Sequence, residues 1–151
     1  MGRFKKVLSL VLVFVFVVSA FATSGSEEVF ADGKYMTRFR RLEAQCKQNY
    51  KYNGNQMEMM WESADEYGFW DKELNVVYSK ELRAIKKKKA KKLKKLQKAW
   101  KKKRVKYAEK QTADFIGSSM YTVEYNMVLI KYTKKRIKWL IKNYKDVGDF
   151  Q

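Results

Sequence analysis

From Met57 onward, apolar residues recur every three or four positions, the spacing that lines one face of an α-helix. The first series is Met57, Met60, Trp61, Ala64, Tyr67, Trp70, Leu74, Tyr78, Leu82 and Ile85. A shorter series follows at Leu93, Leu96, Trp100 and Tyr107. The pattern predicts a long helix from about Met57, which Gly68 can kink without ending it, and a second helix through the later series.

The interval between the two series, Lys86 to Lys92, is lysine with a single alanine. Lysine does not break helices by propensity, but a stretch without apolar side chains at the core-facing positions cannot hold two helices together. Two alternatives follow, a solvated helical stretch and a turn between two antiparallel helices. We favour the turn.

Another helix is predicted near the end of the chain. Residues 111–119 have the composition of a loop, in which Gly117 and Ser118 supply turn and N-cap chemistry, and Gly148 marks the expected end of the helix. Its apolar residues form two adjacent stripes: Tyr121, Tyr125, Val128, Tyr132 and Leu140, and Val123, Met127, Ile130, Ile137, Ile141 and Tyr144. A stripe that wide predicts a helix packed between two others.

Upstream, Thr37 to Tyr50 is polar and permits a short helix, which the turn residues from Asn49 to Asn55 would close. Proline is absent, glycine is rare and strand patterns are hard to find. The sequence therefore predicts an all-α fold, a small antiparallel bundle of three to four helices that follows an N-terminal signal peptide.

The signal peptide is predicted from three features of the first residues. Arg3, Lys5 and Lys6 precede an apolar stretch from Val7 to Val18, and Ala20-Phe21-Ala22 offers the small side chains that a signal peptidase admits. Cleavage after Ala22 is expected, with Ala31 as the alternative end. An uncleaved anchor is the other alternative, although the apolar stretch is shorter than the roughly 20 residues that span a bilayer comfortably.

These observations divide the chain into five parts. The parts are a signal peptide (1–22, or 1–31), a disordered linker (23–34), a short helix with a turn (35–55), a helical domain (56–145) and a tail (146–151).

Charge is the strongest feature after the signal peptide. The net charge is +18, and removal of residues 1–31, with three basic and two acidic residues, leaves +17. Residues 80–106 hold sixteen lysines and arginines against Glu81 alone. Such a run either attracts polyanions by counterion release or is a solvated helical face. The candidate polyanion-binding residues are Lys86, Lys87, Lys88, Lys89, Lys91, Lys92, Lys94 and Lys95.

An exported location restricts the partners of this basic run. Anionic wall polymer and the membrane surface remain as candidates, and a specific nucleic-acid partner is not expected. The sequence assigns no oligomeric state.

Little in the sequence points to catalysis. Histidine is absent, and no cluster of Cys, Asp and Glu has metal-ligand spacing, so we predict no metal and no cofactor. Asp71 and Glu73 lie two residues apart and therefore point away from each other on a helix. The single cysteine, Cys46, cannot form an intrachain disulfide, and it is either an unpaired thiol or a link to another chain. We do not expect an enzyme.

Several motifs recur in a fixed order between Gln56 and Tyr144. They are Glu58-Met59, Tyr67, Asp71-x-Glu73-Leu74-Asn75-x-x-Tyr78, Leu93 with Gln97, Trp100 and Arg104, Gly117-Ser118, and Thr133 with Arg136 and Leu140. In order and spacing the chain resembles the lysozyme-inhibitor LprI-like N-terminal domain family of secreted and periplasmic bacterial proteins. The resemblance implies a non-enzymatic binding protein, some relatives of which block lysozyme. The family's cysteines, near the positions of Glu62, Ala108 and Val128, are missing here.

The motif residues are better suited to architecture than to chemistry. Asp71, Asn75 and Tyr78 share one helical face, and Gln97, Trp100 and Arg104 share another. Packed antiparallel, these faces would pair Asp71 with Arg104 and stack Arg104 on Trp100. Thr133 is expected to bond back to a helix carbonyl, and Arg136 to seek Glu73 or Asp71. We predict a structural role for Asp71, Leu74, Asn75, Tyr78, Gln97, Trp100, Arg104, Thr133, Arg136 and Leu140.

Two hypotheses for function follow. The first is an inhibitor of lysozyme or another wall hydrolase, and the second is a cationic envelope module that binds anionic wall polymer or lipid. A basic lysozyme would be repelled by a chain of this charge unless an acidic patch lay at the binding face. The acidic residues able to form one are Glu58, Glu62, Asp65, Glu66, Asp71 and Glu73.

Overall fold

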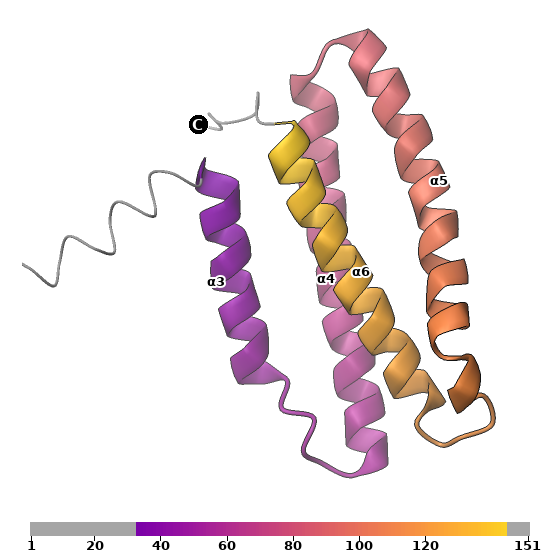
Figure 1. Cartoon of the computed structure of the whole chain (residues 1–151). Helices are drawn as coiled ribbons and strands as arrows, with labels where there is room; N and C mark the ends of the chain where they lie inside the picture. The colour runs from indigo at the N-terminus through magenta and orange to yellow at the C-terminus, as the bar shows by residue number, and fades with distance from the viewer. Residues whose placement is uncertain (1–32, 145–151) are drawn as a thin grey trace, which may run out of the picture. The chain divides into compact units, whose positions relative to one another are not determined.

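A computed structural model describes residues 33–144, and these residues are helical with short connections (Figure 1). The helices are α3 (Gly33–Asn49), α4 (Gln56–Ala84), α5 (Lys87–Gln111) and α6 (Tyr121–Asn143), with a short 3₁₀ turn η1 (Ala113–Phe115) between the last two. The predicted all-α fold is confirmed. The predicted signal peptide, most of the linker and the predicted tail lie outside the described residues.

The chain divides into two units at the boundary between Arg38 and Phe39. Of the first unit the structure describes residues 33–38, the opening turns of α3, where Thr37 Oγ1 donates to the carbonyl of Gly33 at 3.4 Å. The second unit begins at Phe39 and is described as far as Tyr144.

A capping box begins α4. The Asn55 side chain accepts from the Glu58 amide at 3.0 Å, and the Glu58 carboxylate accepts from the Asn55 amide at 2.8 Å, so each satisfies a donor that the first helical turn leaves open. A Cβ on Gly54 would collide with the Glu58 carboxylate. The spacing Asn55-x-x-Glu58 is the sequence signal that places the helix start at Gln56.

The turn between α4 and α5 is shorter than the lysine run suggested. The helix is broken only at Ile85 and Lys86, whose backbones are extended (ψ 151° and 147°). A break between two antiparallel helices is therefore confirmed, but Lys87 to Lys92 form the first turns of α5. They are helical because lysine has a high helix propensity even when exposed to solvent, and because the buried Leu93 packs this end of the helix against the core.

The helix α6 lies against both α4 and α5, as its wide apolar stripe predicted. It runs in the same direction as α4, while α5 runs the opposite way (Figure 1). Gln56 Nε2 donates to the Ser119 carbonyl at 2.6 Å and Asn126 Nδ2 donates to Ser63 Oγ at 3.1 Å, so α4 and α6 stay in register from their first turns. Helices that follow each other in the sequence are antiparallel, whereas α4 and α6, which are separated by α5, are parallel (Figure 1).

The loop before α6 differs from the prediction. The helix begins at Tyr121, and its N-cap, Met120, makes no side-chain capping bond, so Ser118 is not the cap. Gly117 has a φ of +83°, a conformation that favours glycine and turns the chain after η1. The described helix ends at Asn143, and Gly148 lies outside the described residues.

The core is built from buried side chains of all four helices. Its largest fully buried side chains include Trp70, Phe39, Leu74, Leu93, Ile137 and Leu140. The Trp70 ring lies 5.3 Å from both Phe39 and Phe69, and its Nε1 donates to Glu66 at 3.0 Å. This bond satisfies the polar end of the indole, which allows the ring to be fully buried.

The buried face of α4 differs from the predicted one in its first turns. Met57, Trp61 and Ala64 are exposed, and Ser63 and Glu66 are buried. The reason is hydrogen bonding. Ser63 Oγ accepts a hydrogen bond from Asn126, and the Glu66 carboxylate accepts from Trp70 Nε1 and, at 2.6 Å, from the Tyr52 hydroxyl. Buried polar groups with such partners compete with apolar ones for the interior.

Candidate functional site

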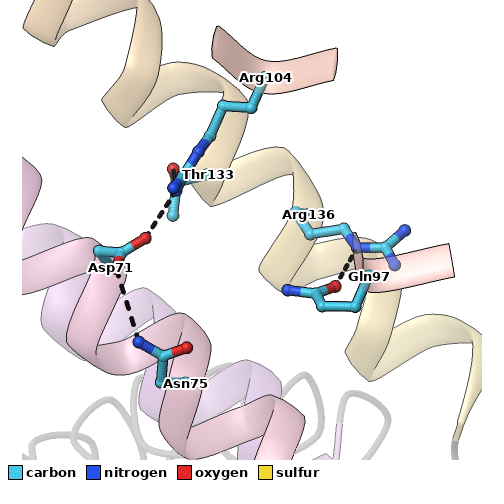
Figure 2. A network of polar contacts seen from close by, with 6 residues as sticks. All are labelled: Asp71, Asn75, Gln97, Arg104, Thr133 and Arg136. Atoms are coloured by element: carbon cyan, nitrogen blue, oxygen red, sulfur yellow. Dashed lines mark hydrogen bonds and ion pairs between the residues drawn. The ribbon is translucent and has the colours of Figure 1, made fainter. Parts of the chain in front are cut away.

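The family-motif residues meet in the interior, where Arg104 of α5 joins α4 to α6 (Figure 2). Its Nη1 lies 2.7 Å from Asp71 Oδ1 and donates to Thr133 Oγ1 at 3.0 Å. Asn75 Nδ2 lies 3.5 Å from Asp71 Oδ2, at the limit of a hydrogen bond. The predicted pair of Asp71 and Arg104 is confirmed. The Thr133 hydroxyl accepts a hydrogen bond from Arg104, whereas it was expected to donate one to a helix carbonyl.

The second arginine of the motif has a different partner from the expected one. Arg136 Nε donates to Gln97 Oε1 at 3.0 Å (Figure 2) and not to the expected carboxylates of Asp71 or Glu73. Burial lowers the pKa of Arg136, since removal from water penalises its charged form. The neighbouring aromatic rings explain how the charge is tolerated without a carboxylate.

Trp100 and Trp139 are aromatic residues that contact the two arginines. The Arg104 guanidinium lies 4.9 Å from the Trp100 ring centre, as predicted, and Arg136 lies 5.5 Å from the same ring and 4.1 Å from that of Trp139. The negative faces of the rings attract both cations. Sequence reasoning missed the contribution of Trp139, although its spacing of three residues from Arg136 was a visible signal.

Three further aromatic residues, all tyrosines, join this group. Tyr132 stacks on Trp100 at 5.9 Å and on Tyr107 at 4.8 Å, and Tyr67 lies 5.4 Å from Arg104. Leu74 and Leu140 are fully buried in the core, and Tyr78 is half-buried, with a pKa that burial raises. Most of the motif residues are buried or half-buried, while Asn75 is exposed and the Asp71 side chain is 31 % exposed.

The predicted polyanion-binding lysines lie together at the start of α5, Lys86 at its N-cap and the others in its first turns. All eight are exposed, namely Lys86, Lys87, Lys88, Lys89, Lys91, Lys92, Lys94 and Lys95. The buried residues of this helix are few, and they begin at Leu93. The structure therefore presents these lysines to solvent at the end of the bundle where α4 turns into α5 (Figure 1).

A separate group of lysines, which sequence reasoning missed, lines a groove beside α6. The groove has a volume of about 530 Å³, and its lining includes Lys131, Lys134, Lys135 and Lys138 over an apolar floor. Lys134 Nζ lies 2.6 Å from Glu43 Oε1, and this pair lowers the pKa of Glu43 against the opposing effect of burial.

The acidic residues of α4 do not form one free patch. Glu66 and Glu73 are buried, Asp71 is paired with Arg104, and Glu62 accepts from the Tyr52 amide at 2.7 Å. Asp65 is exposed and accepts from the Tyr50 hydroxyl at 2.6 Å, which raises the pKa of Tyr50 together with burial. Part of the expected acidic surface therefore makes hydrogen bonds to the connection between α3 and α4.

Residues 33–144 hold neither a cluster suited to a metal ion nor a membrane-spanning helix. No three His, Cys, Asp or Glu side chains gather there as a metal would require, and no helix in that range is long and apolar enough to cross a membrane. Cys46 is a buried free thiol, and burial raises its pKa to about 11. A link from Cys46 to another chain would require this core position to open.

Comparison with known protein families gives a match over most of the helical domain. The family model described as "Lysozyme inhibitor LprI" matches residues 46–140. No curated protein and no solved structure matches the chain.

Proposed function

The chain belongs to the LprI lysozyme inhibitor family, and from this membership we propose that it is an exported, non-enzymatic protein that binds and inhibits lysozyme or a related wall hydrolase. The single observation that carries the proposal is the family match, which covers residues 46–140 and so includes most of the helical bundle.

The interior supports a binding role over a catalytic one. The charged and polar side chains of the interior contact one another, Arg104 with Asp71 and Thr133 and Arg136 with Gln97, although Arg104 Nε and Arg136 Nη2 have no hydrogen-bond partner there. A rigid scaffold of this kind suits inhibition by occlusion, in which the surface of one protein covers the active site of another without losing entropy on ordering.

Export of the chain is part of the proposal. It is supported by the basic start, the apolar stretch from Val7 to Val18 and the small residues up to Ala22. An exported inhibitor would meet hydrolases of the cell wall where they act.

The experiment is an inhibition assay with the exported chain, expressed with its own leader. Turnover of a cell-wall substrate by a basic lysozyme should fall as the protein is added, to a plateau that depends on molar ratio. Unchanged turnover at a large molar excess would contradict the proposal. An equally basic helical protein without the family motifs controls for nonspecific coating of the anionic wall.

A second candidate function rests on the exposed lysines of α5, and it is adhesion to anionic wall polymer or lipid. The test is binding to vesicles that contain anionic lipid and to wall fractions, each at low and high salt. Replacement of Lys86 to Lys89 by glutamine should weaken binding, and equal binding at both salt concentrations would contradict it.

A further inference from the structure

The acidic residues that remain at the surface gather at one end of the bundle. We call this region, residues 50–66 and 109–126, the acidic end; it holds seven acidic side chains, of which Glu66 is buried, against Lys51 and Lys110. The two segments are far apart in sequence, and the parallel packing of α4 and α6 joins them through Gln56 and Ser119. In a chain of net charge +18, this concentration of negative charge is local.

The acidic end also carries the most exposed large apolar side chains of the described residues. Ile116 is 72 % exposed, Trp61 66 % and Met57 58 %, while Phe115 of η1 is exposed to a smaller extent. Exposed apolar groups are ordinary when scattered, but their concentration at one end is typical of a surface that binds a protein.

Folding does not account for this composition. Glu58 serves the capping box, and Glu124 lies in the first turn of α6, where a negative charge is favourable. Glu109, however, lies in the last turn of α5, where the helix dipole disfavours an acid, and the exposed Asp114 follows it in η1. Trp61 and Ile116 gain nothing from the core.

The eight lysines at the start of α5 lie far from the acidic end, whereas the exposed Lys106 lies only three residues before Glu109, at the margin of that end. Lys95 lies sixteen residues before the end of α5 at Gln111, which is roughly 24 Å along the helix axis. At physiological salt the screening length is about 8 Å, so a docked partner feels mainly the charges near its contact surface. A cationic protein can therefore approach this end of a cationic chain.

We propose that the acidic end is the surface that binds the hydrolase, with Trp61 and Ile116 as apolar anchors and Glu109 and Asp114 as acidic groups at their margin. The occupant is a basic lysozyme-type enzyme, because negative charge complements it and because tryptophan at the centre of an interface is a frequent source of binding energy. The inference rests on the proposed function and assigns it a location.

The test measures the dissociation constant and the inhibition constant for a basic lysozyme with four double variants of the exported chain. The two test variants are Trp61→Ala with Ile116→Ser, and Glu109→Gln with Asp114→Asn. The matched controls are Val76→Ser with Leu96→Ser, which are exposed apolar residues elsewhere, and Lys88→Gln with Lys91→Gln, which change the same number of charges at the other end. Thermal unfolding verifies that each variant is folded.

The apolar test variant should weaken binding by about tenfold or more. The acidic test variant should weaken it by about fivefold at low salt, with the difference vanishing at high salt. Both controls should remain within about twofold of the unsubstituted chain. If the unsubstituted chain inhibits and all four variants inhibit equally, the location is wrong and the function stands. If the unsubstituted chain neither binds nor inhibits, both proposals fail.

Discussion

Arg104 Nη1 lies 2.7 Å from Asp71 Oδ1, and this ion pair connects α5 to α4 inside the bundle. The Arg104 side chain is almost wholly buried, and the same nitrogen reaches Thr133 on α6. One guanidinium therefore fixes the three helices of the family domain against one another.

Replacement of Asp71 by alanine should lower the free energy of unfolding by about 2 kcal/mol, because it leaves the buried Arg104 without its acid. The cost stays below that of a fully buried pair, since the Asp71 side chain is 31 % exposed. Urea denaturation measures it. In the double variant with Arg104→Met the loss should be smaller than the sum of the single losses, and strict additivity would show that the pair is not coupled.

Replacement of Arg136 by lysine should cost about 1–2 kcal/mol, although the charge is kept. A lysine cannot present a planar group to Trp139 while it donates to Gln97 as Arg136 Nε does. A double-mutant cycle with Trp139→Leu, followed by chemical denaturation, should give a coupling of about 1 kcal/mol. A coupling of zero would assign the stability to apolar packing alone.

Two glycine substitutions should act in opposite directions. Gly54→Ala should destabilise by about 1 kcal/mol, because its Cβ displaces the Glu58 carboxylate from the capping box. Gly68→Ala is the matched control: it lies within α4, where a Cβ meets open space, and should stabilise by about 0.5–1 kcal/mol. Shifts of the same sign in thermal unfolding would contradict this account of Gly54.

The thiol of Cys46 should make stability depend on pH at the alkaline end. Its pKa is raised from 9.0 to about 11 in the folded chain, chiefly by burial. The folded state therefore prefers the protonated thiol, and the stability it contributes is complete below pH 9 and lost as the pH rises through 11. The measurement is the difference from a Cys46→Ala variant, because this difference isolates the contribution of the thiol. An identical pH profile in that variant would contradict the prediction.

The same burial predicts slow modification of Cys46 in the native protein. A thiol reagent at pH 8 should react at a rate limited by local opening and speed up strongly in denaturant. Reaction as fast as that of a free thiol peptide would show that this position is open in solution.

Local chemistry made part of the site predictable. Asp71 and Arg104, with Trp100 one turn away, were found because opposite charges and an aromatic ring at helical spacing restrict each other's partners. The partner of Arg136 could not be predicted in this way, because Arg136 binds Gln97 and not a carboxylate only as a result of which faces of α5 and α6 meet. The burial of Glu66 likewise depends on Tyr52, a residue outside its helix.

The sequence by itself determined that the chain is helical, where its helices run and that its lysines fall on one solvated stretch, because periodicity and propensity act over a few residues. Only the tertiary structure decided that α4 and α6 run parallel. That packing brings the acidic residues of 50–66 together with those of 109–126, which no local pattern relates, since their proximity depends on contacts between residues some sixty positions apart.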